Sequence, residues 1–100
     1  MMEDLVVLGI LFDYYGELLN DKQKEYFKSY YFDDLSLQEI SDNMNVSRNA
    51  VSKELKLIKN KLYFYEDKLH MYKKDEKLKQ VINKIDDENI KKEIENIIKN

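Results

Sequence analysis

The sequence has no cysteine, no proline and only two glycines, Gly9 and Gly16. Without cysteine there is neither a disulfide framework nor a thiolate metal site, a composition typical of cytosolic proteins. Because sheets and long loops usually need turn residues such as glycine and proline, their scarcity favours helices joined by short connections. We therefore expect an all-α protein whose 100 residues suffice for a single hydrophobic core.

Long apolar segments are also missing. No apolar run approaches the roughly 20 residues that cross a bilayer, so we expect no membrane insertion. Residues 1–8 carry two acids and no basic residue, unlike the positively charged start of a secretory signal peptide. Together with the lack of cysteine, these observations predict a cytoplasmic protein.

The sequence also lacks the residue patterns of common catalytic and metal sites. Its single histidine, His70, lies among apolar and basic neighbours, and there is neither a glycine-rich phosphate loop nor a histidine–glutamate metal spacing. The serines fall at expected helix caps or within helices, and no motif places a general base beside them. We predict that the protein is not an enzyme and that it binds no metal or cofactor.

The charged residues are distributed unevenly. Residues 1–40 hold nine acids and three lysines, a net charge of −6. Residues 41–74 hold eight bases and four acids, or +4, and residues 75–100 hold six bases and seven acids, or −1. Binding to a nucleic-acid backbone depends on a local basic face, so the overall charge of −3 does not exclude it.

Hydrophobic periodicity divides the chain into helices, of which the last stretch can form one or two. The expected helices cover roughly residues 4–19, 22–32, 37–44, 48–72, 75–85 and 87–99. We assign residues 1–74 to a core domain and residues 75–100 to a C-terminal helical extension.

The third and fourth expected helices form a helix-turn-helix. Ser36 and Glu39 make a capping box, because the serine oxygen accepts the third backbone N–H and the glutamate reaches back. Asn45, a residue type that tolerates the left-handed conformation, ends the third helix, and Ser47 caps the fourth after a three-residue turn. Asn45 and Ser41 stand where this motif usually has glycine and alanine, and both are small enough for such positions. The fourth helix is then the recognition helix.

An apolar seam runs along this long recognition helix in alternating steps of four and three residues. Its members are Val51, Leu55, Ile58, Leu62, Tyr65, Leu69 and Tyr72. Such spacing resembles the seam of a coiled coil. Two interpretations stay open: the seam packs on the first two helices of the same chain, or its distal half pairs with a second copy in a homodimer.

The outward residues of the recognition helix suit nucleic acid. With Ile40, Met44, Val46, Val51 and Leu55 turned inward, the outward residues are Arg48, Asn49, Ser52, Lys53 and Lys56. Arginine and asparagine can make bidentate bonds to base edges, whereas serine and lysine bind phosphates. These five residues and Ser47 are the predicted nucleic-acid-binding site, to which the first helical turn adds free backbone N–H groups.

Several sequence runs carry a family resemblance. Three runs resemble region 4 of bacterial sigma factors: LNDKQ (19–23), YYFDDLSLQEI (30–40) and VSRNAV (46–51). The further runs FDYY (12–15) and YEDKL (65–69) are similar to the YlxM-type helix-turn-helix proteins. The resemblance covers about residues 5–74. It implies a sigma-region-4-like helix-turn-helix bundle with a long recognition helix and a C-terminal helical extension.

The resemblance also implies a cellular context. YlxM-type proteins are small cytoplasmic bacterial proteins associated, by gene neighbourhood, with the signal recognition particle pathway and described as regulatory. The 100 residues are too few to include the regions with which a complete sigma factor binds core polymerase and melts a promoter. We therefore do not expect it to be an initiation factor.

Three functions remain open at this point. We favour a regulator that binds duplex DNA through residues 48–56, with two copies on adjacent half-sites to strengthen the binding. The alternative is an accessory protein of the signal recognition particle that binds its RNA or a protein component, with Tyr14 or Tyr63 stacking on unpaired bases. A third hypothesis is a protein-binding module that uses the acidic N-terminal region and the long seam.

Overall fold

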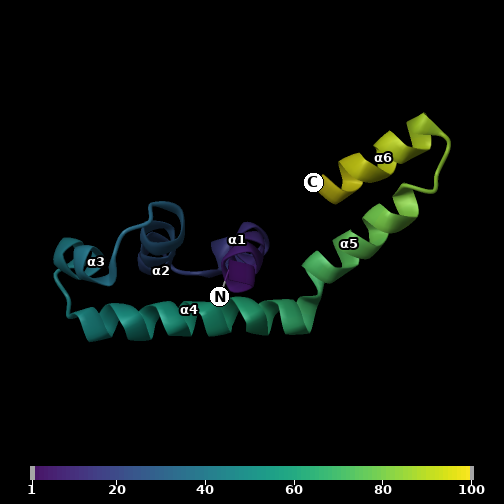
Figure 1. Cartoon of the computed structure of the whole chain (residues 1–100). Coiled ribbons are helices and arrows are strands. Elements are labelled where there is room, and N and C mark those ends of the chain that lie inside the picture. Colours follow the sequence, from purple (N-terminus) through teal and green to yellow (C-terminus); the bar gives the residue numbers. More distant parts are fainter. Residues whose placement is uncertain (1, 100) are drawn as a thin grey trace. The chain divides into compact units, whose positions relative to one another are not determined.

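The computed structural model describes the backbone of residues 2–99 and the side chains of residues 5–99. Within these residues it consists of helices without a β-strand, which confirms the expected all-α class (Figure 1). The chain divides after Leu69 into two compact units. The first unit contains α1 (Met2–Tyr15), the 3₁₀ helix η1 (Gly16–Leu18), α2 (Asp21–Phe27), the π-helix η2 (Lys28–Phe32), α3 (Leu37–Met44) and α4 (Arg48–Leu69). The second contains α5 (Met71–Ile82) and α6 (Glu88–Lys99).

The first helix is shorter than expected because the chain turns at Gly16. α1 ends at Tyr15 and η1 follows, whereas the periodicity predicted one helix over residues 4–19. A Cβ atom on Gly16 would lie 3.1 Å from the ring of Phe12, so the buried glycine lets that ring approach the backbone. The Phe12 ring stacks on the Phe27 ring of α2 with centroids 4.4 Å apart. The turn therefore brings α2 against α1.

The second helix changes type at Lys28. The sequence predicted an uninterrupted α-helix over residues 22–32, but the chain forms the π-helix η2 from Lys28 to Phe32. In an α-helix residues five apart lie on different faces, whereas the wider π turn brings them together. The ring centroids of Tyr31 and Phe32 consequently both lie near that of Phe27, at 4.5 and 5.6 Å. Aromatic packing on Phe27 accounts for the wider turn.

The core of the first unit lies between α4 and the helices before it. In Figure 1, α3, α2 and α1 lie in that order along α4, from its beginning toward its end. The buried apolar residues here are Leu8, Leu11, Tyr15, Leu19, Tyr26, Phe27, Ile40, Val51, Leu55, Ile58 and Leu62. From Val51 to Leu62 the seam of α4 is thus buried in its own chain, which confirms the first interpretation for this part of the helix.

Polar contacts also join α4 to the earlier helices. The Tyr15 hydroxyl donates a hydrogen bond of 2.6 Å to Glu66 Oε1. Gln23, which is buried and completes a capping box with Asn20 at the start of α2, donates its amide N–H to Glu54 Oε1 at 3.3 Å. The start of α2 and the end of α1 are therefore each tied to a carboxylate of α4.

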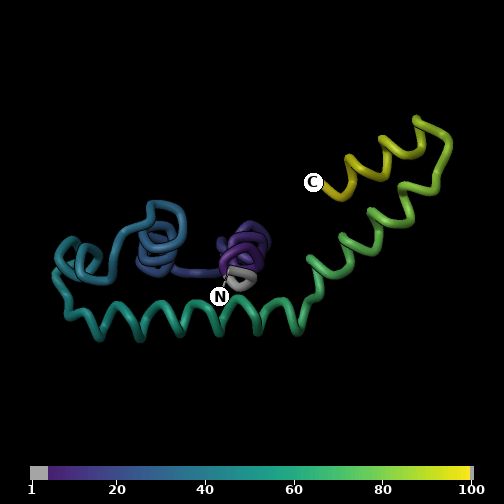
Figure 2. The backbone as a smooth tube through the Cα atoms, in the orientation of Figure 1, coloured from purple at the N-terminus to yellow at the C-terminus, as the bar shows by residue number. Residues whose placement is uncertain are grey.

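α4 ends at Leu69, where the seam predicted a helix to Tyr72. His70 has a φ of 56°, in the left-handed region that breaks a right-handed helix and that histidine enters more readily than most residues. α5 then begins at Met71, and the Lys74 N–H bonds to the His70 carbonyl at 2.8 Å. The backbone trace shows the interruption between the two helices (Figure 2).

The second unit is a pair of helices with little buried surface. The expected helices at 75–85 and 87–99 are present as α5, which begins and ends earlier, and α6. Asp87 caps α6 by accepting the Asn89 N–H at 2.9 Å. Among the described residues of this unit, Ile82 is the one apolar side chain that is buried. No helix within residues 2–99 has the combination of length and apolar character that a membrane span needs.

Candidate nucleic-acid interface

α3 begins with the capping box that the sequence predicted. The Glu39 N–H donates to Ser36 Oγ at 3.1 Å, and the Ser36 N–H donates to Glu39 Oε1 at 3.0 Å. The backbone N–H of Ser36, and then its hydroxyl, hold the pKa of the Glu39 carboxyl below its ordinary value. Both interactions favour a charged carboxylate in the first turn of a helix, where the helix dipole also favours it.

Buried Ser41 stabilises the turn between α3 and α4 through two hydrogen bonds with Val46. Asn45 adopts the expected left-handed conformation, with φ 55° and ψ 46°. The Val46 N–H donates to the Ser41 carbonyl at 3.1 Å, and the Ser41 hydroxyl donates to the Val46 carbonyl at 2.6 Å. Ser41 is 6% exposed, so its hydroxyl satisfies a carbonyl that the turn leaves without a helical partner. The sequence identified Ser41 only as a tolerated small residue.

Ser47 caps α4, as expected. Its Oγ accepts the Ala50 N–H at 3.0 Å, and its carbonyl accepts the Val51 N–H at 3.2 Å. A phosphate contact by Ser47 would therefore use its hydroxyl proton, because the oxygen already serves the cap.

The residues predicted to turn inward do so. Ile40, Val51 and Leu55 are buried, and Met44 and Val46 are half-buried. α3 therefore contacts α4 through an apolar face, and this contact fixes which side of α4 faces solvent. The tight reversal between the two helices is visible in the backbone trace (Figure 2).

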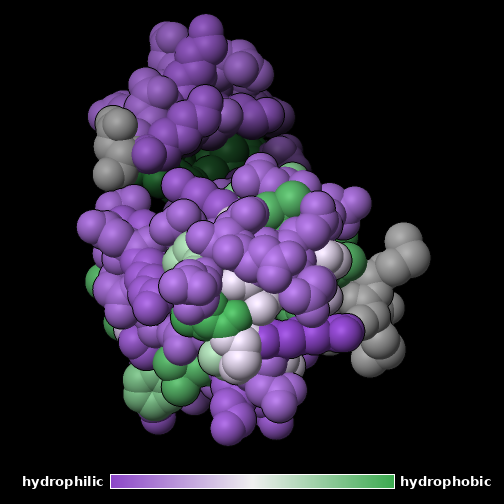
Figure 3. All heavy atoms as spheres, turned by 90° about the vertical axis from the view of Figure 1, so that its left-hand side faces the viewer, coloured by the Kyte–Doolittle hydropathy of each residue, from purple (hydrophilic) through white to green (hydrophobic). Residues whose placement is uncertain are grey.

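The residues predicted to turn outward are exposed. They are Ser47, Arg48, Asn49, Ser52, Lys53 and Lys56. Within the described residues, Arg48, Lys53 and Lys56 form no ion pair, so their charges are not neutralised there. The end of the molecule that carries α3 and the beginning of α4 presents a mainly hydrophilic surface with small apolar areas (Figure 3).

The structure extends this surface to Lys59 and Tyr30, which sequence reasoning did not select. Ser52, Lys56, Lys59 and Tyr63 follow one another in steps of four, three and four residues, so they lie on one side of α4. Between this side of the helix and η2 is a hollow of about 330 Å³, which we call the tyrosine–lysine groove. Its lining residues are Tyr30, Tyr31, Leu37, Ser52, Leu55, Lys56 and Lys59. The spacing of the lysines was available in the sequence, but the position of Tyr30 beside them was not.

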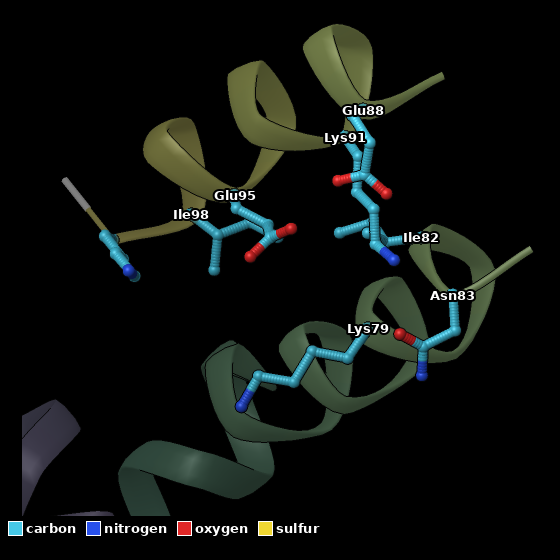
Figure 4. A pocket seen from close by; sticks show the side chains of 8 residues that line it. Lys79, Ile82, Asn83, Glu88, Lys91, Glu95 and Ile98 are labelled. Atoms are coloured by element: carbon cyan, nitrogen blue, oxygen red, sulfur yellow. The ribbon is translucent and has the colours of Figure 1, made fainter. Parts of the chain in front are cut away.

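Another hollow, of about 480 Å³, lies between α5 and α6. Ile82 of α5 and Glu95 and Ile98 of α6 point into the space between the two helices (Figure 4). Its charged lining residues mix lysines with the carboxylates Glu88 and Glu95, so it presents no field of one sign. Among the residues that the structure describes, no cluster of histidine and carboxylate side chains could hold a metal ion.

Comparison with known proteins agrees with this architecture. A sequence model of the family described as "UPF0122: Putative helix-turn-helix protein, YlxM / p13 like" matches residues 2–100. A UPF0122 protein of Caldanaerobacter subterraneus is 44% identical over 85 residues, which are 85% of this chain and 73% of that protein. A UPF0122 protein of Fusobacterium nucleatum is 36% identical over 100 residues, all of this chain and 97% of that protein. The fold, the helix-turn-helix geometry and these matches together place the chain in the UPF0122 family of YlxM- and p13-like helix-turn-helix proteins.

Proposed function

We propose that this protein is a non-enzymatic regulator that binds duplex DNA through the exposed side of α4. The observation that carries the proposal is the group of cations at Arg48, Lys53 and Lys56, which are exposed and form no ion pair within the described residues. They lie on a helix that α3 holds in a fixed orientation. Membership in a helix-turn-helix family supports nucleic acid as the ligand.

The positions along α4 suggest a division of roles. In helix-turn-helix complexes, the N-terminal residues of the recognition helix contact base edges. Arg48 and Asn49 occupy that turn and can form bidentate bonds to bases. Ser52, Lys53 and Lys56 follow within the next two turns, where hydroxyl and ammonium groups bind phosphates. Such a regulator would act in the cytoplasm, where bacterial DNA is found.

Salt dependence of binding tests the proposal. Each lysine that binds a phosphate releases counterions, so affinity for a random 20-base-pair duplex should fall steeply with salt. Lys53→Ala or Lys56→Ala should weaken binding to all sequences alike and reduce the slope of log K against log salt by about 0.9 each. Lys77→Ala is the matched control, because it removes the same charge from an exposed residue of α5.

Fluorescence anisotropy of a labelled duplex measures these affinities. No binding at any salt concentration, or an equal loss in the Lys77→Ala control, would contradict the proposal. If the chain binds DNA but Lys53→Ala and Lys56→Ala change nothing, the DNA contact lies elsewhere on the molecule. If the basic residues of α4 can be neutralised in cells without any phenotype, a protein-binding module gains support instead.

Sequence preference tests the role of the first turn. Arg48→Ala and Asn49→Ala should relax discrimination between duplexes, by about 1–3 kcal/mol for each bidentate pair of hydrogen bonds that the variant can no longer form. Selection of bound duplexes from a random library, for the wild type and both variants, measures this. If both variants keep the sequence preference of the wild type, residues other than Arg48 and Asn49 must contact the bases.

A second copy would strengthen the binding, because one helix with a few phosphate contacts binds weakly. Leu57 is 48% exposed and Phe64 is 57% exposed, and they lie seven residues apart on α4, away from the buried seam. We propose that these two side chains form the contact between copies. Light scattering should give twice the chain mass for the wild type and a lower mass for the double variant Leu57→Glu, Phe64→Glu. A monomeric wild type at the concentrations of DNA binding would exclude this arrangement.

The alternative function is an accessory role in the signal recognition particle pathway through RNA. Tyr63 supports it, because this tyrosine is 36% exposed and lies on the same side of α4 as Lys56 and Lys59. An aromatic ring beside lysines suits unpaired bases, whereas the narrow major groove of an RNA duplex does not admit a helix. Tyr14 is half-buried and is the weaker candidate for stacking. Sequencing of the RNA and DNA crosslinked to the protein in cells discriminates: particle RNA supports this role and promoter DNA supports the first.

A further inference from the structure

The tyrosine–lysine groove combines an aromatic wall with a cationic rim. Tyr30 and Tyr31 of η2 line one side, and Lys56 and Lys59 of α4 are its charged lining residues. Its volume of about 330 Å³ lies in the range of roughly 300–1,000 Å³ that is usual for small-molecule clefts. A second hollow shares Tyr30 and Tyr31 with the groove but has Asp34 and Glu39 in its lining, so an anion should prefer the lysine side of the tyrosine pair.

The π-helix holds the aromatic wall in place. The Tyr31 ring stacks on Phe27, whose side chain is fully buried in the core. Tyr30 stands edge-on to Tyr31, with ring centroids 5.0 Å apart and planes 85° apart, and is 36% exposed. Wide turns of this kind occur frequently at functional sites. The groove therefore presents an anchored tyrosine pair beside two ammonium groups.

These properties select a ligand with a flat aromatic part and a negative charge. A nucleotide has both, because a base stacks on an aromatic ring while its phosphate binds lysine. In a paired duplex the bases are stacked on each other and cannot enter such a groove. Lys56 and Lys59 lie about 12–16 Å along α4 from Arg48, so they meet the nucleic acid beside the base pairs that the first turn reads.

We propose that the tyrosine–lysine groove binds one unpaired nucleotide of the bound strand, with its base against Tyr30 and its phosphate on Lys56 and Lys59. This inference rests on the proposed nucleic-acid binding and adds a structural preference to it. The preferred ligand is a duplex interrupted by an unpaired nucleotide. Because DNA and RNA share the base and the phosphate, both backbones are included in the test.

Four hairpin probes test the inference in the full-length protein. They are a continuous DNA stem, the same stem with one bulged nucleotide, and the two corresponding RNA stems. The wild type should bind the bulged stem about tenfold more tightly than the continuous stem of the same backbone, the usual size of one base–aromatic stack. The backbone with the larger gain identifies whether DNA or RNA is the source of the nucleotide.

Variants separate the groove from the rest of the surface. Tyr30→Ala should abolish the preference for the bulge while affinity for the continuous stem stays the same, and Tyr30→Phe should keep the preference. Lys59→Gln should reduce the preference in part. Lys53→Ala should weaken both kinds of stem equally. Irradiation of a bulged 5-iodouridine should crosslink the wild type at the peptide that contains Tyr30.

The outcomes are distinct for the two proposals. Equal affinity for bulged and continuous stems, or a preference that survives Tyr30→Ala, would overturn the groove assignment and leave the proposed function intact. Binding to none of the four probes would overturn the proposed function itself. Circular dichroism of Tyr30→Ala provides the control for folding, and Tyr30→Phe keeps the inference testable if that variant is unstable.

Discussion

Three serines fix the geometry of the helix-turn-helix at the scale of single residues. Ser36 caps α3, Ser41 closes the turn, and Ser47 caps α4, each through a hydrogen bond from or to its hydroxyl. A cap of this type is worth about 1 kcal/mol. An isolated helix as short as α3 is unstable in water, so such local bonds and the contact with α4 together define it.

The pKa of the Glu39 carboxyl is lowered by the hydrogen bonds of the capping box, so a change in the box should change this pKa. Because this pKa is lowered in the folded protein, the box stabilises fully above the ordinary carboxyl pKa, and its contribution is lost as pH falls through the lowered value. Ser36→Ala removes the hydroxyl but keeps the backbone N–H, so the pKa of Glu39 should rise only part of the way toward its ordinary value. An NMR titration of the Glu39 carboxyl in both proteins measures this. Identical titrations would mean that the hydroxyl does not act on the carboxylate.

Asn45 offers a test of backbone strain at the turn. Its φ of 55° is a conformation that glycine adopts without the steric penalty of a side chain. Asn45→Gly should therefore leave the free energy of unfolding unchanged or raise it by up to about 1 kcal/mol, whereas Asn45→Ala should lower it by about 1 kcal/mol. Urea denaturation followed by circular dichroism measures both. Destabilisation by glycine comparable to that by alanine would show that the asparagine side chain itself holds the turn.

At the scale of elements, α4 is the part of the first unit against which α1, α2 and α3 pack. One side of it carries the buried seam, and a neighbouring side carries Ser52, Lys56, Lys59 and Tyr63. The same helix therefore forms the core and presents the candidate interface. Because the buried seam and the exposed cations are different residues of this helix, stability and binding should depend on separate side chains of α4.

Adjacent residues of α4 should differ sharply in their effect on stability. Ile58 is fully buried, whereas its neighbour Leu57 is 48% exposed. Ile58→Ala should lower the free energy of unfolding by about 2–5 kcal/mol, because it reduces apolar burial and leaves an internal cavity. Leu57→Ala should change it by less than about 1 kcal/mol. Chemical denaturation at a concentration where the chain is monomeric makes the comparison, and similar losses of stability for both variants would contradict this packing of α4.

At the scale of the whole molecule, apolar burial is concentrated in the first unit. Among the described side chains, the buried aromatic and aliphatic residues belong to α1, α2, α3, α4 and the turn at Leu19, with Ile82 as the exception. Hydrophobic burial is the dominant favourable term in folding. The first unit therefore holds most of the stability, and α5 and α6 are stabilised weakly by contacts with each other.

We accordingly propose that residues 1–74 form a self-sufficient domain, as the sequence suggested. A chain ending at Lys74 should keep a cooperative unfolding transition at a similar midpoint temperature and the affinity for duplex DNA of the full chain. Hydrogen exchange on the full protein should show faster exchange in α5 and α6 than in α4. Loss of cooperative unfolding in the shortened chain would mean that the C-terminal helices complete the core.

Local sequence patterns were enough to predict the features that depend on neighbours within one helical turn. The capping box of Ser36 and Glu39, the left-handed Asn45 and the Ser47 cap involve residues at most a few positions apart, so their patterns are readable without a fold. The alternation of apolar and polar residues likewise determined which side of α4 is buried.

Features that depend on contacts between residues far apart in the sequence became visible in the folded protein alone. The π-helix arises where Phe27 packs on Phe12 and Tyr31, and the break at His70 follows where the seam runs out of partners, since Leu69 is 48% exposed. The groove between Tyr30 and Lys59 exists because α3 packs against both η2 and α4. Local sequence patterns carry no record of such contacts, because their energy is realised only when the chain has closed on itself.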